Sequence, residues 1–591
     1  MMGDKMTQTV FHGKRYASKH VRRLAFRGLR VALVAAAGMA LQAYAGIIDL
    51  SGETVEISTV NGLNTYLGHD VRNGVLTVSA NQGFADGTFT FGAGLVLNQT
   101  DGMWGTSGSR TVQIVDGCVV NYTSKSPVWF GRTYAGVTYN GTTQLILNNG
   151  TFRGGSAEIS FPHALANNSN RDKNVIVNFL MSNKSSLSTS SEVRFGEIEQ
   201  ADGKKEKTLK VTVNVEDSAI TAKQLRFGQT NNYLSDPANS YVSATFGPES
   251  ELTVNQLYAY AYPAPTVTFN GATIHYAGTG SNSFIGQNSG LSGDLYEILS
   301  EGLTVDIPSG KTLTVDGNSS AIKGVGGITK IGAGSIFWNN ITSKGSQKML
   351  FTGPLVVTEG AWSSSLGYAA TAFRAEGGNL TLSGALSSGN IAFSAADGVL
   401  TLAGATITDA APALTLASGG STDYFTRDGA VATYTLDSFD LGEGAILDLD
   451  ANATDIDTIS VATTNLTATA ANPVTINLFF SDVPASGRTF RLFKTDDKEK
   501  FTVVPVRGGI MIPHEVSVAD GYLTLTITAV VENYTWNTTK TNWGDTDAWT
   551  KEGEDVTWVD GNNAIFATAD AAAVIAAPVL ASKVEFTAPA W

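Results

Sequence analysis

Four aspartates form the densest group of potential metal ligands in the sequence. Asp448, Asp450, Asp455 and Asp457 lie within ten residues. Carboxylates at alternate positions of a strand share one face, and carboxylate oxygens are ligands that Ca²⁺ prefers. The Gly-Gly-x-Gly-x-Asp nonapeptide of calcium-binding repeats is absent. We therefore expect exposed, solvated acids at the end of a structural repeat, and calcium binding is the alternative.

Aromatic side chains form a second group. Trp104, Trp129, Tyr134 and Tyr139 lie close together in the sequence. Aromatic faces pack on the apolar faces of sugars and offer polar edges, so these residues are candidates for a glycan-stacking platform. Packing in a core, or capping of a structural repeat, explains the same residues equally well.

No combination of residues predicts catalysis. Arg132, Glu216 and Asp217 are the scattered candidates, but their spacing does not form the carboxylate pair that a glycosidase requires. The six His are isolated and match no metal motif. The single Cys118 follows a turn within an apolar segment, which predicts a buried, inert thiol. We predict a non-enzymatic protein with no catalytic, cofactor-binding or metal-binding residues.

The elements that would position these groups are short strands. Between residues 46 and 435 an alternating strand, a tight polar turn and an apolar segment recur, with strands at 76–78, 112–115, 145–147, 211–215, 267–269, 313–315, 380–382 and 400–402. Alternation places Leu, Val and Ile on one face and Thr on the other. Asn-Gly and Asp-Gly turns supply the positive φ of tight bends.

Spacing distinguishes a solenoid from separate hairpins. Each unit alone fits a hairpin, but the units recur at intervals of about 20 to 50 residues, as solenoid coils do. Some 390 residues are also too many for one sandwich core. We predict an all-β, right-handed parallel β-helix (β-solenoid) with Asn or Thr ladders at its bends.

One stretch, residues 326–361, has the most regular pattern. Lys330, Gly332 and Gly334 form Lys-x-Gly-x-Gly, and Gly353 and Gly360 follow at the ends of the next strands. This pattern resembles the autotransporter-associated β-strand repeat. The resemblance implies one coil of a β-solenoid in a bacterial surface protein of Gram-negative type, and these five residues have structural roles.

The N-terminus predicts export. Residues 1–45 combine a basic region, a short apolar stretch and Ala43-Tyr44-Ala45, as a cleaved signal peptide does; a retained basic anchor helix is the alternative.

The chain has a net charge of −14, and eight Lys or Arg against one Asp in residues 1–45 leave −21 for residues 46–591. Such an acidic product argues against nucleic-acid binding, and no later segment is apolar enough to be an integral membrane helix.

Two further regions follow the repeats. Residues 436–530 resemble the region after the repeats in autotransporter-type proteins and predict closing coils and a β-rich cap. Residues 531–591 contain Trp536, Trp543, Trp549 and Trp558, and they resemble the unit that opens a further repeat block in large surface proteins. We expect these Trp to form a small packed cap, and we expect the block to be truncated.

Together these observations predict an exported, autotransporter-like protein of the cell surface or extracellular medium, with the periplasm as an alternative. Its expected role is adhesion or surface display, and its expected partners are glycans or the surface of a host or neighbouring cell. A polysaccharide lyase or hydrolase on the same β-helix is one alternative. A structural spacer within a longer surface protein is the other.

Overall fold

The computed structural model describes most of the chain after residue 45. The described residues are 46–58, 60–79, 84–100, 109–130, 140–166, 174–200, 207–229, 234, 236–260, 262–278, 280–282, 285–287, 296–315, 322–338, 348–482, 484–528, 532–559, 562–568, 573–576, 579, 581 and 583–587. The predicted signal peptide, residues 1–45, therefore lies outside them.

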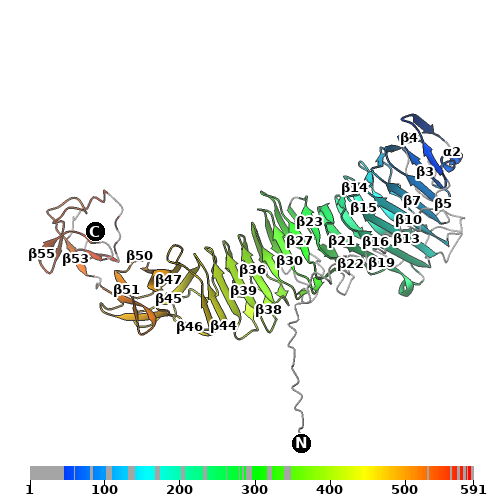
Figure 1. Cartoon of the computed structure of the whole chain (residues 1–591). Helices are drawn as coiled ribbons and strands as arrows, with labels where there is room; N and C mark the ends of the chain where they lie inside the picture. The colour runs from blue at the N-terminus through cyan, green and yellow to red at the C-terminus, as the bar shows by residue number, and fades with distance from the viewer. Residues whose placement is uncertain are drawn as a thin grey trace, which may run out of the picture.

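Two long parallel sheets run along an elongated molecule (Figure 1). Sheet A contains, in order of pairing, β1 (Gly46–Asp49), β3 (His69–Arg72), β5 (Gly87–Phe91), β7 (Arg110–Val115), β10 (Asn140–Asn148), β13 (Asn174–Ser182), β16 (Thr208–Val215), β19 (Tyr241–Phe246), β22 (Thr266–Phe269), β26 (Tyr296–Ile298), β29 (Ile322–Gly324), β32 (Lys348–Phe351), β35 (Gly367–Tyr368), β38 (Ala385–Leu386) and β41 (Thr406–Ile407).

Sheet B has 17 strands, each paired in parallel with the strand of the next coil. They are β2 (Thr54–Ile57), β4 (Gly74–Val78), β6 (Leu95–Gln99), β8 (Val119–Tyr122), β11 (Thr151–Arg153), β14 (Ser186–Ser188), β17 (Ala219–Thr221), β20 (Glu251–Val254), β23 (Ala272–Tyr276), β27 (Leu303–Asp306), β30 (Ile328–Ile331), β33 (Leu355–Val357), β36 (Ala372–Glu376), β39 (Ala392–Ala396), β42 (Ala413–Ala417), β44 (Thr433–Leu441) and β46 (Thr458–Leu466). The predicted parallel β-solenoid is confirmed.

The third face of the solenoid is divided between two sheets. Sheet C contains β9 (Val128–Trp129), β12 (Ile159–Ala166), β15 (Glu192–Gln200), β18 (Gln224–Phe227), β21 (Gln256–Ala259) and β25 (Ile285–Gln287). Sheet D contains β24 (Gly280–Asn282), β28 (Thr312–Val315), β31 (Ser335–Trp338), β34 (Ala361–Ser364), β37 (Asn379–Leu382), β40 (Val399–Thr401) and β43 (Ser421–Thr422). The coil that contains both β24 and β25 is where the third face changes from one sheet to the other.

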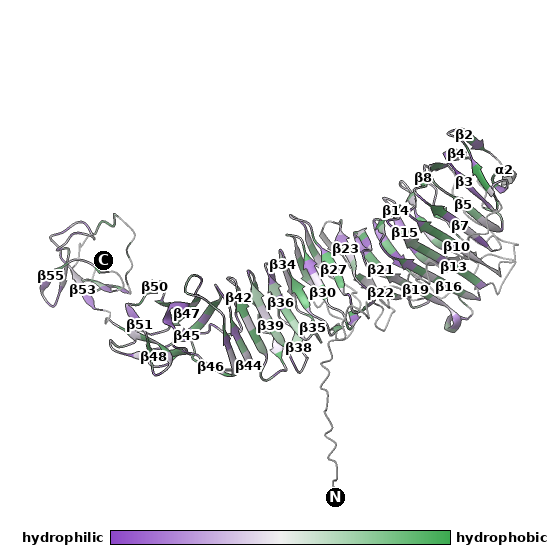
Figure 2. Cartoon of the chain, viewed as in Figure 1, coloured by the Kyte–Doolittle hydropathy of each residue, from purple (hydrophilic) through white to green (hydrophobic). Residues whose placement is uncertain are grey.

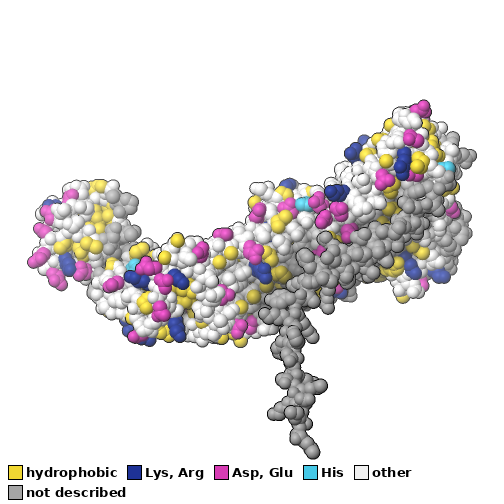
Figure 3. Space-filling view, viewed as in Figure 1, with side chains coloured by type: hydrophobic (Ala, Val, Ile, Leu, Met, Phe, Trp, Pro, Cys, Tyr) yellow, Lys and Arg dark blue, Asp and Glu magenta, His cyan; other side chains and the backbone are white. Residues whose placement is uncertain are grey.

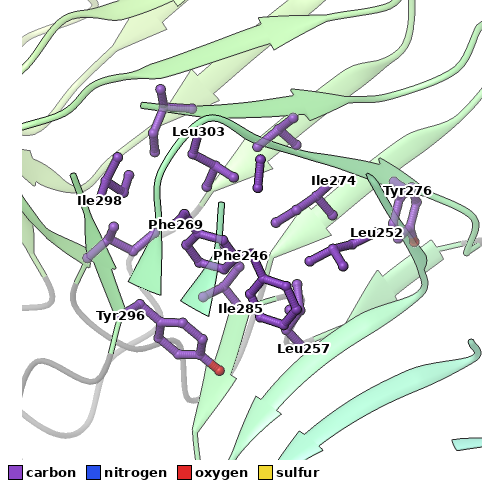
Figure 4. Close-up of a cluster of buried hydrophobic side chains, with 14 of the residues drawn as sticks. Phe246, Leu252, Leu257, Phe269, Ile274, Tyr276, Ile285, Tyr296, Ile298 and Leu303 are labelled. Atoms are coloured by element: carbon purple, nitrogen blue, oxygen red, sulfur yellow. The ribbon is translucent and has the colours of Figure 1, made fainter. Parts of the chain in front are cut away.

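Alternating side chains fill the interior. Burial alternates along strands such as β13 and β16, and Figure 2 shows apolar and polar residues interleaved along the strands. Aromatic rings stack from coil to coil: the ring centres of Phe161 and Phe195 are 5.4 Å apart, and those of Phe195 and Phe227 are 5.7 Å apart. Figure 4 shows the same core further along, where Phe246, Phe269 and Tyr296 converge with aliphatic side chains. Apolar burial on this scale is the main stabilising contribution.

The bends behave as the sequence predicts. Asp116 and Gly117 have φ angles of 53° and 83°, the left-handed region that these residue types tolerate. Asn121 Nδ2 donates to Asn98 Oδ1 at 3.1 Å between successive coils. Thr100 Oγ1 donates to the Val78 carbonyl of the preceding coil. The positive-φ turns and a Thr hydrogen bond between coils are therefore confirmed at these bends, whereas the Asn98–Asn121 bond lies within strands β6 and β8 rather than at a bend.

Parallel pairing continues past residue 435, which lies inside β44, into a closing region. One closing sheet comprises β45 (Ile446–Ala451), β47 (Val474–Phe480), β49 (Phe501–Arg507) and β50 (Ile510–Met511). An antiparallel sheet of β48 (Thr489–Lys494), β52 (Tyr522–Ile527) and β51 (His514–Ala519) packs on the same core. The predicted β-rich cap is present, and its change to antiparallel pairing ends the repeated parallel edge.

The last unit has its own small core. Its sheet comprises β55 (Glu554–Val556), β54 (Trp549–Lys551), β53 (Asn533–Trp536), β56 (Asn563–Phe566) and β57 (Lys583–Phe586). Trp536, Trp543 and Trp549 are buried there, and Trp558 packs against them half-exposed. The prediction that these Trp form a packed structural unit is confirmed.

Helices are short and few among the described residues: α2 (Val60–Asn64) and the 3₁₀ turns η1 (Pro237–Asn239) and η2 (Lys498–Lys500). None of the helices in the described ranges is long and apolar enough to cross a bilayer.

Candidate functional site on sheet C

The four predicted glycan-stacking residues do not all fall in the described chain. Trp129 lies on β9 with a half-buried side chain. Trp104, Tyr134 and Tyr139 lie outside the described residues, as does Arg132, one of the three scattered catalytic candidates. Trp129 is therefore the one member of that group whose neighbours can be assigned.

Trp129 begins a row of outward-facing side chains that crosses sheet C. Parallel pairing places Trp129 opposite Ser160, and Ser160 opposite Arg194. The row continues through Arg226 to Tyr258. Neighbouring strands lie about 4.8 Å apart, so five successive coils place these side chains in line along the axis of the solenoid, with Ser160 buried beneath its neighbours.

A network of charges centres on Arg194. Its Nη2 lies 2.9 Å from Glu158 Oε2, its Nε donates to Glu192 Oε2 at 2.9 Å, and its Nη1 donates to Glu197 Oε1 at 2.5 Å. The buried Ser160 hydroxyl donates to Glu158 Oε1 at 2.9 Å. We call Glu158, Glu192, Glu197, Arg194 and Arg226 the sheet C cluster; each of its side chains is about one-fifth exposed.

Arg226 connects this cluster to two aromatic rings. Its Nη1 donates to Glu192 Oε2 at 2.8 Å, and its Nη2 donates to the Tyr260 hydroxyl. The Arg226 guanidinium also lies 4.5 Å from the centre of the Tyr260 ring, a cation–π contact. The Tyr258 and Tyr260 rings are 4.9 Å apart. Charged groups and partly exposed aromatic rings therefore share one surface.

The carboxyl groups of the cluster differ in acidity. Burial raises the pKa of Glu158, and Arg194 offsets only part of this effect. Burial also opposes the charge of Glu192, but the hydrogen bonds and charges of Arg226 and Arg194 outweigh burial and lower the pKa of Glu192. The pKa values of the two groups are thus shifted in opposite directions.

The sheet C cluster was not predicted from the sequence, although a periodic signal was present. The segments Glu192-Val-Arg-Phe-Gly196, Gln224-Leu-Arg-Phe-Gly228 and Gln256-Leu-Tyr-Ala-Tyr260 repeat at intervals of 32 residues. In the structure, Gln224 Nε2 donates to Gln256 Oε1 at 2.6 Å between two of these segments. Aligning the segments would have predicted that their polar residues stack.

The aspartate group of the closing region has a structural role, and the expectation that all four acids are exposed is wrong for two of them. Asp450 and Asp457 are both 3% exposed. Asp457 accepts hydrogen bonds from the backbone N–H groups of Ala432 and Asp450, both at 2.8 Å. Backbone donors thus offset the burial of a carboxylate. Asp455 is exposed and Asp448 half-exposed, and the described residues contain no group of three or more metal-binding side chains.

The other predicted catalytic candidates are not brought together with the cluster. Glu216 and Asp217 form the turn between β16 and β17, where Asp217 has a φ of 45°. Cys118 is fully buried, and burial raises the pKa of its thiol to about 12. The prediction that this thiol is buried is confirmed, and its low reactivity stays a prediction.

Lys330 of the repeat motif faces the core. It stands between Val305 and Val357 in a row of buried side chains. Its ammonium donates to three backbone carbonyls at the corner between sheets B and D: Gly332, Gly334 at 2.6 Å and Glu359 at 2.7 Å. Burial lowers the pKa of Lys330 to about 8, with Glu359 and Asp306 opposing the shift, so the group remains protonated at neutral pH.

The glycines of the motif allow coils to approach closely. A Cβ on Gly334 would overlap the carbonyl oxygens of Pro308 and Lys311, and a Cβ on Gly360 would overlap the Gly334 oxygen and the Lys330 ammonium. Gly332 and Gly353 are similarly crowded by the neighbouring coil. The predicted role of turning the backbone applies to Gly332 and Gly360, which have positive φ, whereas Gly334 and Gly353 are required for space.

Charge elsewhere on the surface is mixed. Figure 3 shows acidic and basic side chains interspersed over the visible face. Arg427 and Arg491 also lie over aromatic rings, each beside a single acid; the sheet C cluster differs from them in joining five charged side chains in one network. Comparison with protein-family models, with curated proteins and with solved structures finds no match to this chain.

Proposed function

We propose that this chain is an exported, non-enzymatic β-solenoid of the autotransporter passenger type that binds glycans through sheet C and so serves adhesion or surface display. The observation that supports the binding role is the outward row from Trp129 to Tyr258, with Tyr260 beside it. Aromatic rings offer apolar faces to sugars, and the adjacent amide and carboxylate groups offer hydrogen bonds. Export and surface location rest on the N-terminal segment and the repeat pattern.

The experiment is a glycan-binding measurement on residues 46–591. A glycan array identifies ligands, and calorimetry compares the parent with the double variant Tyr258→Ala/Tyr260→Ala. Two aromatic contacts contribute about 1.5 kcal/mol or more, so we expect affinity to fall at least about tenfold. Phe337→Ala is the matched control, because Phe337 is an exposed aromatic residue on the outer face of sheet D.

Three outcomes separate the proposals. A loss of affinity confined to the sheet C variant supports glycan binding there. Equal losses in both variants would indicate nonspecific aromatic adsorption and contradict the assignment to sheet C. A parent protein that binds no glycan and no cell surface would instead support a structural spacer.

A polysaccharide-active enzyme is the second candidate, and one observation favours it. Burial raises the pKa of Glu158, whereas hydrogen bonds from Arg226 and Arg194 outweigh burial and lower the pKa of Glu192; carboxyl groups with opposed pKa shifts divide the roles of acid and base in glycosidases. Incubation with a panel of polysaccharides tests this candidate. New reducing ends or unsaturated products that disappear in Glu158→Gln, with binding retained, would overturn the non-enzymatic proposal.

A further inference from the structure

The carboxylates of the sheet C cluster outnumber its guanidinium groups. Three glutamates surround two arginines, so the cluster has a net charge of −1 when every member is ionised. Each of these side chains retains some exposure to solvent. A ligand that reaches this surface therefore encounters an excess of negative charge.

The two guanidinium groups already have anionic partners. Arg194 lies within hydrogen-bonding distance of all three glutamates, and Glu192 Oε2 accepts from both Arg194 and Arg226. An additional carboxylate, such as that of a uronic acid, would compete with these ion pairs and be repelled by the remaining glutamates. An ammonium group would instead be attracted by the same oxygens.

The neighbouring aromatic rings favour the same kind of ligand. Tyr260 already holds the Arg226 guanidinium against its ring at 4.5 Å, which shows that this surface accommodates a cation over an aromatic face. Tyr258 lies 4.9 Å away and provides a second ring. Residues 46–591 also have a net charge of −21, so long-range attraction favours cationic polymers over anionic ones.

We propose that the glycan bound by sheet C is a linear polysaccharide with free amino sugars, lying along the solenoid axis across β12, β15, β18 and β21. Its amines contact the carboxylates of the cluster, and one of its pyranose rings stacks on Tyr258, beside Tyr260, where the polysaccharide crosses β21. This inference rests on the proposed glycan-binding function and adds the charge of the ligand and its direction.

Calorimetry with three oligosaccharides of equal length tests the charge selection. The probes are oligomers of glucosamine, of N-acetylglucosamine and of galacturonic acid, at about pH 6, where most primary amines are protonated. We expect glucosamine oligomers to bind at least tenfold more tightly than galacturonic acid oligomers. N-acetylglucosamine oligomers should be intermediate, and the preference should shrink as salt is added.

The variant Glu158→Gln/Glu197→Gln removes two carboxylates and keeps the shape of both side chains. It should reduce the preference for glucosamine over N-acetylglucosamine several-fold. Glu251→Gln is the matched control, because Glu251 is an exposed acid on the adjacent sheet B, and it should leave the preference unchanged. Circular dichroism establishes that each variant is folded.

The outcomes distinguish this inference from the function on which it rests. Equal affinity for all three oligomers, still lost in Tyr258→Ala/Tyr260→Ala, would overturn the charge selection and leave glycan binding intact. Tighter binding of galacturonic acid oligomers would also overturn it. Failure to bind any glycan on an array would contradict the proposed function itself.

Discussion

Sheets C and D form the same face of one solenoid, but their outer surfaces differ. The row on sheet C reads Trp129, Ser160, Arg194, Arg226 and Tyr258. The equivalent central row on sheet D reads Thr314, Phe337, Ser363, Thr381 and Thr401. One row is dominated by charged and aromatic groups, and the other by small hydroxyl groups.

The coils that contribute strands to sheet C are longer than those that contribute strands to sheet D. Gln224 and Gln256, which bond between successive strands of sheet C, are 32 residues apart. Ser383, just after β37 of sheet D, donates to the carbonyl of Ser364 on the preceding coil, only 19 residues earlier. The connection from β18 to β19 accordingly spans residues 228–240, whereas the one from β34 to β35 is only residues 365–366. Longer connections are where repeat proteins tend to acquire recognition.

Two kinds of information lie in different segments of the sequence. Residues 326–361, which indicate the fold, build the tight corner beside sheet D, where Lys330 and the glycines are buried among backbone groups. The residues proposed to bind a ligand lie on sheet C in the longer coils. The segment that best identifies the architecture is therefore not the segment that presents a candidate site.

The largest expected effect is at the tight corner. Gly334→Ala forces a Cβ against two backbone carbonyls that cannot rotate away, so we expect a loss of about 3 kcal/mol in the free energy of unfolding. Gly310→Ala is the control: its φ is +74° but no atom lies within 4 Å of an added Cβ, so about 1 kcal/mol is expected. Urea denaturation monitored by hydrogen exchange in the coils around β31 measures both. Equal losses would show that close approach is not what selects glycine at position 334.

The next largest effect on stability is expected from Lys330→Met. Methionine fits the apolar row between Val305 and Val357, but the carbonyls of Gly332, Gly334 and Glu359 lose a charged donor. We expect a loss of about 2 kcal/mol. Lys323→Met, on the neighbouring β29 with a half-exposed side chain, should change stability by less than about 0.5 kcal/mol. The same denaturation measurement compares them, and a neutral Lys330→Met would contradict a bonding role.

Lys330 also predicts a pH dependence. Burial lowers its pKa from 10.5 to about 8, so between these values the unfolded chain binds more protons than the folded chain. The free energy of unfolding contributed by this group therefore rises as pH increases through that window. The difference in stability between the parent and Lys330→Met should grow from pH 8 to pH 10.5, as measured by denaturation at several pH values. A difference that stays constant or falls would contradict the lowered pKa.

Much of the fold was predictable from local rules. Turns such as Asp116-Gly117 and alternating strands such as 211–215 specify coils without knowledge of their partners. The orientation of Lys330 was not predictable, because a lysine in a sequence suggests a solvated charge and its three acceptors come from the folding of two coils. Asp450 and Asp457 were misjudged for the same reason, since their donors are backbone groups of other turns.

Prediction of the sheet C cluster from the sequence requires the register between successive coils. The step along the chain from Ser160 to Arg194 is longer than the equal steps from Arg194 to Arg226 and from Arg226 to Tyr258. Connections of unequal length change the number of residues between equivalent positions of successive coils. Acids and aromatic residues that stack in space are therefore unevenly spaced in the sequence. Register can be assigned only when the buried strands are aligned first, and the segments around Phe195 and Phe227 would have provided that alignment.

The smallest expected effect on stability is in the sheet C cluster itself. Arg194→Met removes the partner of three carboxylates, but each of these groups is about one-fifth exposed and regains part of its hydration. We therefore expect a loss of about 1 kcal/mol at low salt. Added salt screens repulsion among the remaining glutamates and should reduce this loss, whereas the loss in Lys330→Met, which involves buried carbonyls, should be nearly independent of salt. Denaturation of both variants at two ionic strengths measures the contrast. A large loss that does not depend on salt would make the cluster a structural element like the Lys330 corner, and it would remove the distinction between the two halves of the solenoid.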